Sequence, residues 1–267
     1  MKAGEYGGKD RELEPERERL RYLSEALNPS TQRWMREIGI RPGWRCLEVG
    51  AAEGSMTRWM AEQVGPSGCV VAADIDVRFL AGLDLPNVEV RELDLRTAEL
   101  EPSAFDLAYC RTLLLHLPDP RAAVASLAAA VRPGGFVFAH EPDMCLSVAV
   151  DPEHAAAETF ADVHRRVFAE IRKGKLFDTQ LGRTLPALFR SLGLEDVRAE
   201  GTAAMNRGRS ANAEQMTRTL RDALGPFLLK RGILTPEELD LVLACYDDPG
   251  FEFLSGVQMA VWGRRPA

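Results

Sequence analysis

The chain has 267 residues, of which 46% are hydrophobic and 27% charged, as expected for a globular protein with a substantial core. Its formal net charge is −7, so its surface has no general attraction for polyanions, which argues against nucleic acid as the main substrate. It has neither an apolar run approaching the roughly 20 residues that span a bilayer nor the apolar core of a secretory signal, so we expect a cytoplasmic protein that does not bind membranes.

The first 39 residues predict two helices. Apolar residues at helical spacing predict an amphipathic helix over about residues 11–27. Asn28 followed by Pro29 is a typical helix start, and it predicts a second helix that continues to about Ile38.

A strand-to-helix turn near residue 50 is the most informative stretch of the chain. An apolar strand carries Glu48 near its end and leads into a tight loop bounded by Gly50 and Gly54, where missing side chains let a ligand approach the backbone. The dinucleotide and phosphate-loop patterns both fail, because Ala52 and Ser55 replace glycines and no lysine follows. The loop therefore lacks the amide nest that a pyrophosphate needs, which disfavours a nicotinamide oxidoreductase.

A second apolar strand, over residues 69–73, ends at Asp74. In nucleotide-binding α/β folds an acid at the tip of the neighbouring strand meets the hydroxyls of a nucleoside ribose. The glycine turn and this acid together predict a nucleoside cofactor.

Strand and helix signals then continue to alternate, which predicts a parallel, doubly wound sheet with right-handed crossovers. Ligands bind such sheets at the carboxyl ends of the strands, and four polar residues are predicted to lie there: Glu48, Asp74, Asp94 and Arg111. The strands are expected near residues 45–49, 69–73, 88–91, 105–110 and 135–140.

After residue 143 the simple alternation stops and helices dominate. Four helices are expected. The first begins at Asp151–Pro152, and the second covers about residues 179–192. The third is long and carries Leu220, Leu224, Phe227 and Leu228, and the fourth begins at a capping box at Thr235. Strands are expected near residues 195–200 and 254–262. The five cysteines form no C-x-x-C pair, so a zinc site is not expected.

Five stretches in this order resemble the motifs of class I S-adenosylmethionine (SAM)-dependent methyltransferases of the small-molecule type. The first reads E-x-G-x-x-x-G, where the family usually has [DE]-x-G-x-G-x-G, so Ala52 departs from the family at the middle glycine. The others are Asp74-Ile75-Asp76, Leu93-Asp94-Leu95, the strand from Phe105 to Arg111, and Val131-Arg132-Pro133-Gly134-Gly135. The resemblance is strong over residues 40–142 and only an outline elsewhere.

The resemblance implies an α/β fold: a doubly wound, Rossmann-like, seven-stranded, mostly parallel sheet whose last strand is antiparallel, with a helical lid. It implies an N-terminal helical lid segment over residues 1–39 and a methyltransferase domain over residues 40–267. Helical inserts at about residues 144–192 and 202–250 are expected to cover the substrate.

The resemblance also assigns the cofactor SAM, with S-adenosylhomocysteine as its product, to the ends of these strands. Glu48 would orient the loop or the amino end of the cofactor, and the glycine turn would admit its methionine part. Asp74 would hold the ribose, Ile75 would cover the adenine and Asp94 would accept from its amino group. The predicted cofactor-binding residues are Glu48, Gly50, Ala51, Ala52, Gly54, Asp74, Ile75, Asp94, Leu95 and Arg111, the last two through their backbones.

A general base is harder to assign. His116, His140 and Glu141 lie closest to the expected pocket, and each is a candidate proton acceptor for a hydroxyl substrate. An acidic phenol, a thiol or a free amine needs little beyond alignment. No metal is expected, because Cys110-Arg111 stands where magnesium-dependent catechol enzymes place an acid.

A small organic acceptor, such as a secondary metabolite, fits best by elimination. The alternative is a protein that binds SAM without transferring its methyl group, as a catalyst of rearrangement or cyclisation or as a regulatory binder. The sequence is compatible with a homodimer.

Overall fold

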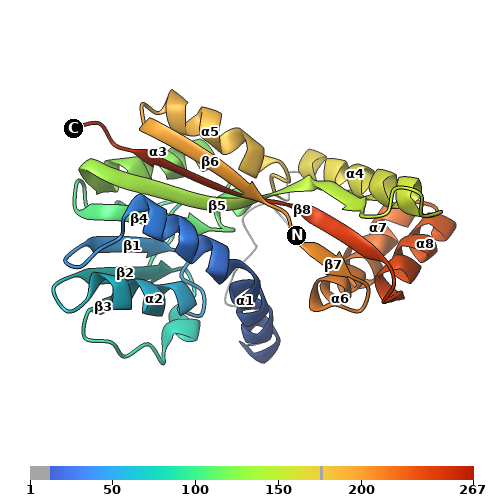
Figure 1. Cartoon of the computed structure of the whole chain (residues 1–267), viewed down its shortest axis with the longest axis horizontal. Coiled ribbons are helices and arrows are strands. Elements are labelled where there is room, and N and C mark those ends of the chain that lie inside the picture. Colours follow the sequence, from blue (N-terminus) through green and yellow to red (C-terminus); the bar gives the residue numbers. More distant parts are fainter. Residues whose placement is uncertain (1–12, 175–176) are drawn as a thin grey trace. The chain divides into compact units, whose positions relative to one another are not determined.

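The computed structural model describes residues 13–174 and 177–267. These residues divide into two compact units (Figure 1). The first unit contains residues up to Glu141, Leu181–Glu200 and Met259–Ala267, and the second contains Pro142–Gln180 and Gly201–Gln258. Residues 1–12, the first part of the predicted lid segment, lie outside the described residues.

The sheet has the order β3-β2-β1-β4-β5-β8-β6, with β7 paired to β8. Strands β1 to β5 pair in parallel, and β8 runs in the opposite direction to its neighbours β5 and β6 (Figure 1). The predicted mostly parallel, doubly wound sheet with an antiparallel last strand is therefore confirmed. The strands are β1 (Arg45–Val49), β2 (Cys69–Asp74), β3 (Val88–Glu92), β4 (Phe105–Arg111), β5 (Val131–Ala149), β6 (Glu195–Thr202), β7 (Met205–Arg207) and β8 (Glu252–Arg264).

The described residues form eight strands, not the predicted seven. The additional strand, β7, has three residues and pairs antiparallel with the first residues of β8. Its residues are exposed or half-buried, so it carries none of the apolar alternation by which a strand is predicted from sequence.

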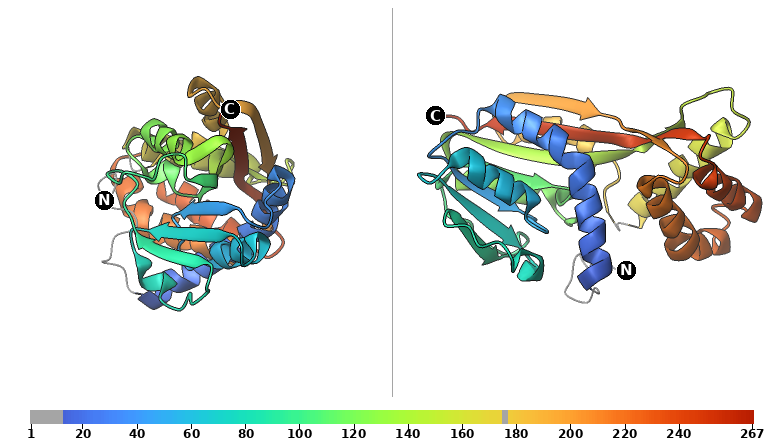
Figure 2. Two further views of the ribbon diagram at one scale, coloured as in Figure 1. Left: turned by 90° about the vertical axis from the view of Figure 1, so that its left-hand side faces the viewer. Right: turned by 60° about the horizontal axis from the view of Figure 1, so that its bottom comes forward.

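The helical elements of the first unit are α1 (Leu13–Ile38), α2 (Ser55–Val64), the short turns η1 (Val77–Leu80) and η2 (Leu114–His116), α3 (Pro120–Ala130) and α5 (Leu181–Ser191). Helix α1, in dark blue, lies beside α2 (Figure 2). Their facing side chains join the sheet in one apolar cluster that includes Trp34, Met35, Met56, Met60 and Phe138.

The predicted break of the N-terminal helix at Pro29 is wrong, because α1 runs through it without interruption. Proline has no N–H to donate, which usually interrupts a helix. The apolar face of α1 is buried on both sides of the proline, at Leu27 and Trp34, so packing outweighs the lost backbone bond.

The second unit contains α4 (Ala157–Lys173), α6 (Ala211–Arg218), a π-helical segment η3 (Thr219–Leu224), α7 (Gly225–Lys230) and α8 (Pro236–Asp247). The capping box predicted at Thr235 is confirmed, since both of its hydrogen bonds with Glu238 are present. The long helix predicted to carry Leu220, Leu224, Phe227 and Leu228 is confirmed, because helical conformation runs without a break from Ala211 to Lys230. Its middle part, Thr219–Leu224, has the wider π turn, just before Pro226, whose missing N–H and ring disfavour a regular α turn.

Helix α4 begins at Ala157 and not at Asp151–Pro152 as predicted. The Asp151 carboxylate accepts instead from the backbone N–H of Glu153, at 3.0 Å, and holds the segment in a turn. Within the two described ranges of the chain, no helix has the length and apolar character needed to cross a membrane.

A buried histidine joins α4 to α8 in the second unit. His164 Nδ1 donates to the carbonyl of Phe160, at 2.7 Å, so its Nε2 accepts from the Tyr246 hydroxyl, at 2.6 Å. The pair lies among aromatic rings that include Phe168 and Phe253. Burial lowers the pKa of His164 from 6.5 to about 4, so the imidazole is neutral in the folded protein near neutral pH.

We predict that this histidine makes the protein less stable in acid. The pKa of His164 is lower in the folded state than in the unfolded state, so the unfolded state binds a proton first as the pH falls. The contribution of His164 to the free energy of unfolding is therefore complete above pH 6.5 and is lost as the pH falls towards about 4. Urea titrations across this range should show a smaller pH dependence of the unfolding free energy in His164→Gln than in the wild type. Tyr246→Phe, which leaves Nε2 without its donor, should cost about 1–3 kcal/mol at neutral pH. Equal slopes in the wild type and His164→Gln would contradict this account.

Candidate active site

The glycine turn after β1 has the backbone conformation that its glycines predict. Gly50 and Gly54 both have a φ of 78°, a left-handed backbone conformation that residues with a Cβ atom disfavour. A methyl group at Gly54 would lie 3.1 Å from the Leu80 side chain, and one at Gly50 would lie 3.4 Å from Leu113. The backbone N–H of Gly50 donates to the carbonyl of Ala73 at 2.8 Å, which fixes the turn against β2.

Ala52, at the position where the resembling family has a glycine, is also left-handed, with a φ of 51°. An alanine there carries a conformational cost that glycine avoids. Its N–H donates to Asp74 Oδ2 at 2.8 Å, so a carboxylate compensates by holding the strained residue. The sequence of the motif thus differs from the family pattern at residue 52, but the backbone there keeps the left-handed conformation typical of glycine.

Asp74 connects the loops after β1 and β2. Its Oδ2 accepts from Ala52 and its Oδ1 accepts from the backbone N–H of Asp76, at 2.9 Å. The carboxylate is half-buried, and burial raises its pKa despite these bonds. Because a carboxylate offers about four acceptor positions, Asp74 retains capacity for further donors. Beside it, Ile75 is 37% exposed.

Asp94 lies after β3 and is bound to a neighbour. Its two oxygens accept from the Arg96 guanidinium at 2.7–3.1 Å, and this contact lowers the pKa of Asp94. The next residue, Leu95, is buried. A ligand amino group at this position would share Asp94 with Arg96.

Glu48 is buried in β1 and faces α2. It accepts from the hydroxyl of Thr57 at 2.5 Å, and burial raises its pKa to about 8. This bond ties the strand to the helix on either side of the glycine turn. Thr57 was missed by the sequence analysis, because a threonine within a helix has no distinctive pattern.

Polar side chains of α1 bind the strand ends, and the sequence analysis missed them too. Ser24 donates to Glu53 in the glycine turn at 2.6 Å, while Asn28 and Thr31 accept from the Arg111 guanidinium at 2.9 and 3.1 Å. The spacing of these three residues places them on one helix face. Ser24 and Thr31 are buried. Small polar residues on an otherwise apolar helix face are the sequence signal that could have predicted these buried contacts.

His140, at the tip of β5, meets the same helix. The Thr31 hydroxyl donates to Leu27, so it must accept both from Arg111 and from His140 Nδ1, at 3.0 Å. His140 is fully buried against Trp34, 5.0 Å away, and burial lowers its pKa to about 3. Its Nε2 has no hydrogen-bond partner among the described residues.

Glu141 holds the loop after β4. Its carboxylate accepts from the backbone N–H groups of Leu113 and Leu114, both at 2.9 Å, and of Leu115, at 3.4 Å. The side chain is fully buried, and burial raises its pKa to about 7. Since Leu113 lies against Gly50, Glu141 indirectly shapes the glycine turn. His116 ends the same loop and is half-buried.

The structure therefore brings the predicted residues Glu48, Gly50, Asp74, Arg111 and Glu141 to the carboxyl ends of neighbouring strands. The arrangement offers backbone space at the turn and acceptor capacity at Asp74. In the part of the chain that the structure describes, no three His, Cys, Asp or Glu side chains form a group that could hold a metal ion.

Curated relatives match part of the chain. It is 31% identical over 120 residues to a ubiquinone biosynthesis O-methyltransferase of Paracidovorax citrulli, covering 42% of this chain and 49% of that protein. It is 33% identical over 111 residues to an uncharacterised 37.1 kDa transposon protein of Streptomyces fradiae, covering 40% of this chain and 32% of that one. The chain thus spans about half the length, or less, of these relatives.

Solved structures share the fold at low identity. A putative methyltransferase from Bacillus halodurans superimposes with a TM-score of 0.54 at 15% identity, covering 88% of this chain and 98% of that one. Phosphoethanolamine N-methyltransferase 2 of Haemonchus contortus, solved with SAM, superimposes with a TM-score of 0.51 at 15% identity. The match covers 88% of this chain and 53% of that one. The methyltransferase domain family matches residues 9–199, which is more than half of the sequence. The chain therefore belongs to the family of SAM-dependent methyltransferase domains.

Proposed function

We propose that the chain transfers the sulfonium methyl group of SAM to an oxygen of a small organic acceptor, with a secondary metabolite as the substrate class. The observation that carries this proposal is Asp74, a half-buried carboxylate with spare acceptor capacity beside a glycine turn. Family membership assigns the cofactor, and the O-methyltransferase name of curated relatives favours an oxygen acceptor.

The residues present fit this cofactor. Asp74 would accept from the ribose hydroxyls, and the exposed Ile75 would cover one face of the adenine. The turn from Gly50 to Gly54 would admit the methionine part, where a side chain at either glycine would crowd Leu113 or Leu80. When bound, SAM supplies an electrophilic methyl group, and the protein aligns the acceptor and excludes water.

Of the three candidate proton acceptors, His116 fits best. His140 and Glu141 are fully buried: Nδ1 of His140 binds Thr31, and the Glu141 carboxylate binds the loop after β4. A proton acceptor must come within hydrogen-bond reach of the substrate, which favours the half-buried His116. We assign His140 and Glu141 to positioning: the histidine holds α1 and the glutamate holds the loop.

The N-terminal segment over residues 1–39 would act as the lid, and the helical inserts at about residues 144–192 and 202–250 would cover the substrate. The bonds of α1 to Glu53 and Arg111 support the first assignment, because they place this helix at the strand ends. A cytoplasmic location and a homodimeric state are parts of the proposal that rest on the sequence.

The competing function is a SAM-binding protein that transfers no methyl group. Incubation with SAM and a panel of phenols, alcohols and carboxylic acids separates the two functions. We expect S-adenosylhomocysteine and a methylated product in equal amounts with at least one oxygen acceptor. SAM binding without S-adenosylhomocysteine formation on any acceptor would favour the competing function, and methylation only of amines or thiols would refute the oxygen acceptor.

We predict that Asp74→Ala weakens SAM binding by about tenfold or more, because the ribose hydroxyls lose a charged acceptor, about 1.5–3 kcal/mol. Calorimetric titration with SAM measures the loss. Asp84→Ala is the matched control, since Asp84 is an exposed aspartate outside the predicted site. Equal affinities of the two variants would contradict the assignment of Asp74.

We predict that Glu141→Ala lowers both stability and SAM affinity, because buried backbone N–H groups lose their acceptor at about 1–3 kcal/mol each. Glu141→Gln keeps one acceptor oxygen and should retain part of both. The two variants are compared by urea denaturation and calorimetry. If Glu141 were instead the catalytic base, Glu141→Gln would bind SAM normally and lose only turnover.

A further inference from the structure

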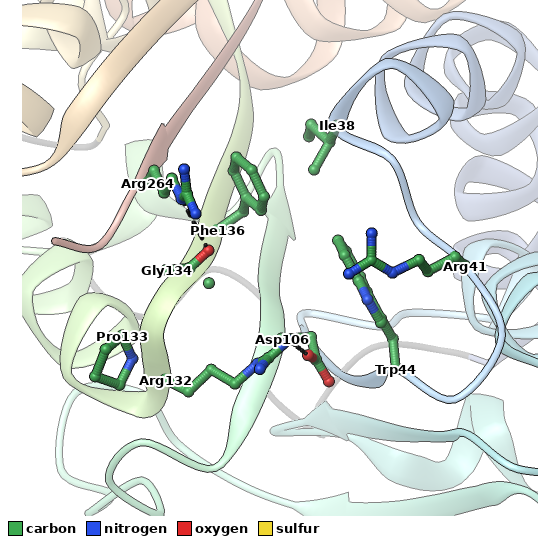
Figure 3. A pocket seen from close by; sticks show the side chains of 10 residues that line it. Ile38, Arg41, Trp44, Asp106, Arg132, Pro133, Gly134, Phe136 and Arg264 are labelled. Atoms are coloured by element: carbon green, nitrogen blue, oxygen red, sulfur yellow. Dashed lines mark hydrogen bonds and ion pairs between the residues drawn. The ribbon is translucent and has the colours of Figure 1, made fainter. Parts of the chain in front are cut away.

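We propose that the first unit carries a second binding site, for a small organic phosphate, at the end of the sheet away from the glycine turn. A cavity of about 360 Å³ lies where β1, β4 and β5 begin (Figure 3). Its wall includes Trp44, just before β1, Asp106 in β4, and Arg132 and Phe136 in β5. Gly50 and Asp74 lie at the opposite ends of parallel strands, so this cavity is separate from the proposed cofactor site.

The wall of the cavity is positively charged. It contains three arginines, Arg41, Arg132 and Arg264, and one acid, Asp106. Both oxygens of Asp106 have a partner: one accepts from the backbone N–H of Arg45 at 2.7 Å, and the other pairs with Arg132, whose charge it neutralises. Two positive charges therefore remain uncompensated, on a chain whose net charge is −7.

Of the three arginines of the cavity, Arg41 and Arg264 have no acidic partner among the described residues. The Arg264 guanidinium donates to the carbonyl of Gly134 at 3.2 Å, and that of Arg41 lies over the Trp44 ring, 5.3 Å from its centre. Neither contacts a carboxylate within the described residues. Figure 3 shows the two guanidinium groups on opposite sides of the cavity.

The cavity also has an aromatic wall. Trp44 is only 6% exposed, and its indole N–H is buried without a hydrogen-bond partner in the described part of the chain. The Trp44 and Phe136 rings stack with an interplanar angle of 22°, which offers an apolar surface beside the charges.

These features select the ligand class. Two guanidinium groups without an acidic partner match the double negative charge of a phosphate dianion better than the single charge of a carboxylate. The aromatic surface fits a planar organic group attached to that phosphate. The volume is at the small end of the range of roughly 300–1,000 Å³ for ligand pockets, which limits the ligand to a small molecule.

Phenyl phosphate is a suitable probe, with inorganic phosphate and phenol as its two halves. Calorimetry at constant ionic strength should show phenyl phosphate binding with a Kd of about 1 mM or tighter. Inorganic phosphate should bind more weakly, and phenol more weakly still. Arg41→Gln and Arg264→Gln should each weaken phenyl phosphate binding about tenfold or more, and circular dichroism should confirm that they fold.

Two variants serve as controls. Arg190→Gln removes an exposed arginine of α5 that does not line the cavity, and Asp74→Ala alters the proposed cofactor site; both should bind phenyl phosphate like the wild type. A loss in Asp74→Ala would place the probe in the cofactor site and overturn the proposal. No binding at millimolar concentration, unchanged binding in Arg41→Gln and Arg264→Gln, or inorganic phosphate or phenol binding as tightly as phenyl phosphate would also overturn it.

Discussion

The site depends on one carboxylate that holds two loops at once. Asp74 accepts from Ala52 in the glycine turn and from Asp76 after its own strand. Ala52 has a left-handed backbone that alanine disfavours, so this bond compensates part of its conformational cost. The shape of the turn and the acceptor proposed for the ribose are therefore set by the same side chain. Removing it would disturb both the geometry and the chemistry of the site.

A second layer of buried polar groups fixes the surrounding elements. Glu48 joins β1 to α2, Glu141 holds the loop after β4, and Thr31 brings Arg111 and His140 to α1. Each group is buried and bonded within the protein, which suits it to positioning more than to proton transfer. Since SAM carries the reactive methyl group, a rigid frame that aligns an acceptor is what the chemistry requires of the protein.

The sequence was sufficient for features whose cause is local or periodic. Buried apolar strands ending in polar residues predicted the parallel sheet and the place of Asp74, and the capping box predicted the start of α8. Local signals gave a wrong prediction where tertiary packing determines the structure. Pro29 predicted a helix start, but it lies inside α1. Leu113 lies 28 residues from Glu141 along the chain, and Arg111 lies 80 residues from Thr31. No local sequence pattern encodes contacts over such separations.

The most direct test of the account compares S-adenosylhomocysteine with its 2′,3′-dideoxy analogue on the wild type and on Asp74→Ala, by calorimetry. If Asp74 accepts from the ribose, the wild type should prefer the hydroxylated ligand by about tenfold or more, and the variant should lose most of that preference. An equal preference in both proteins would show that the ribose is held elsewhere, and would contradict the central claim.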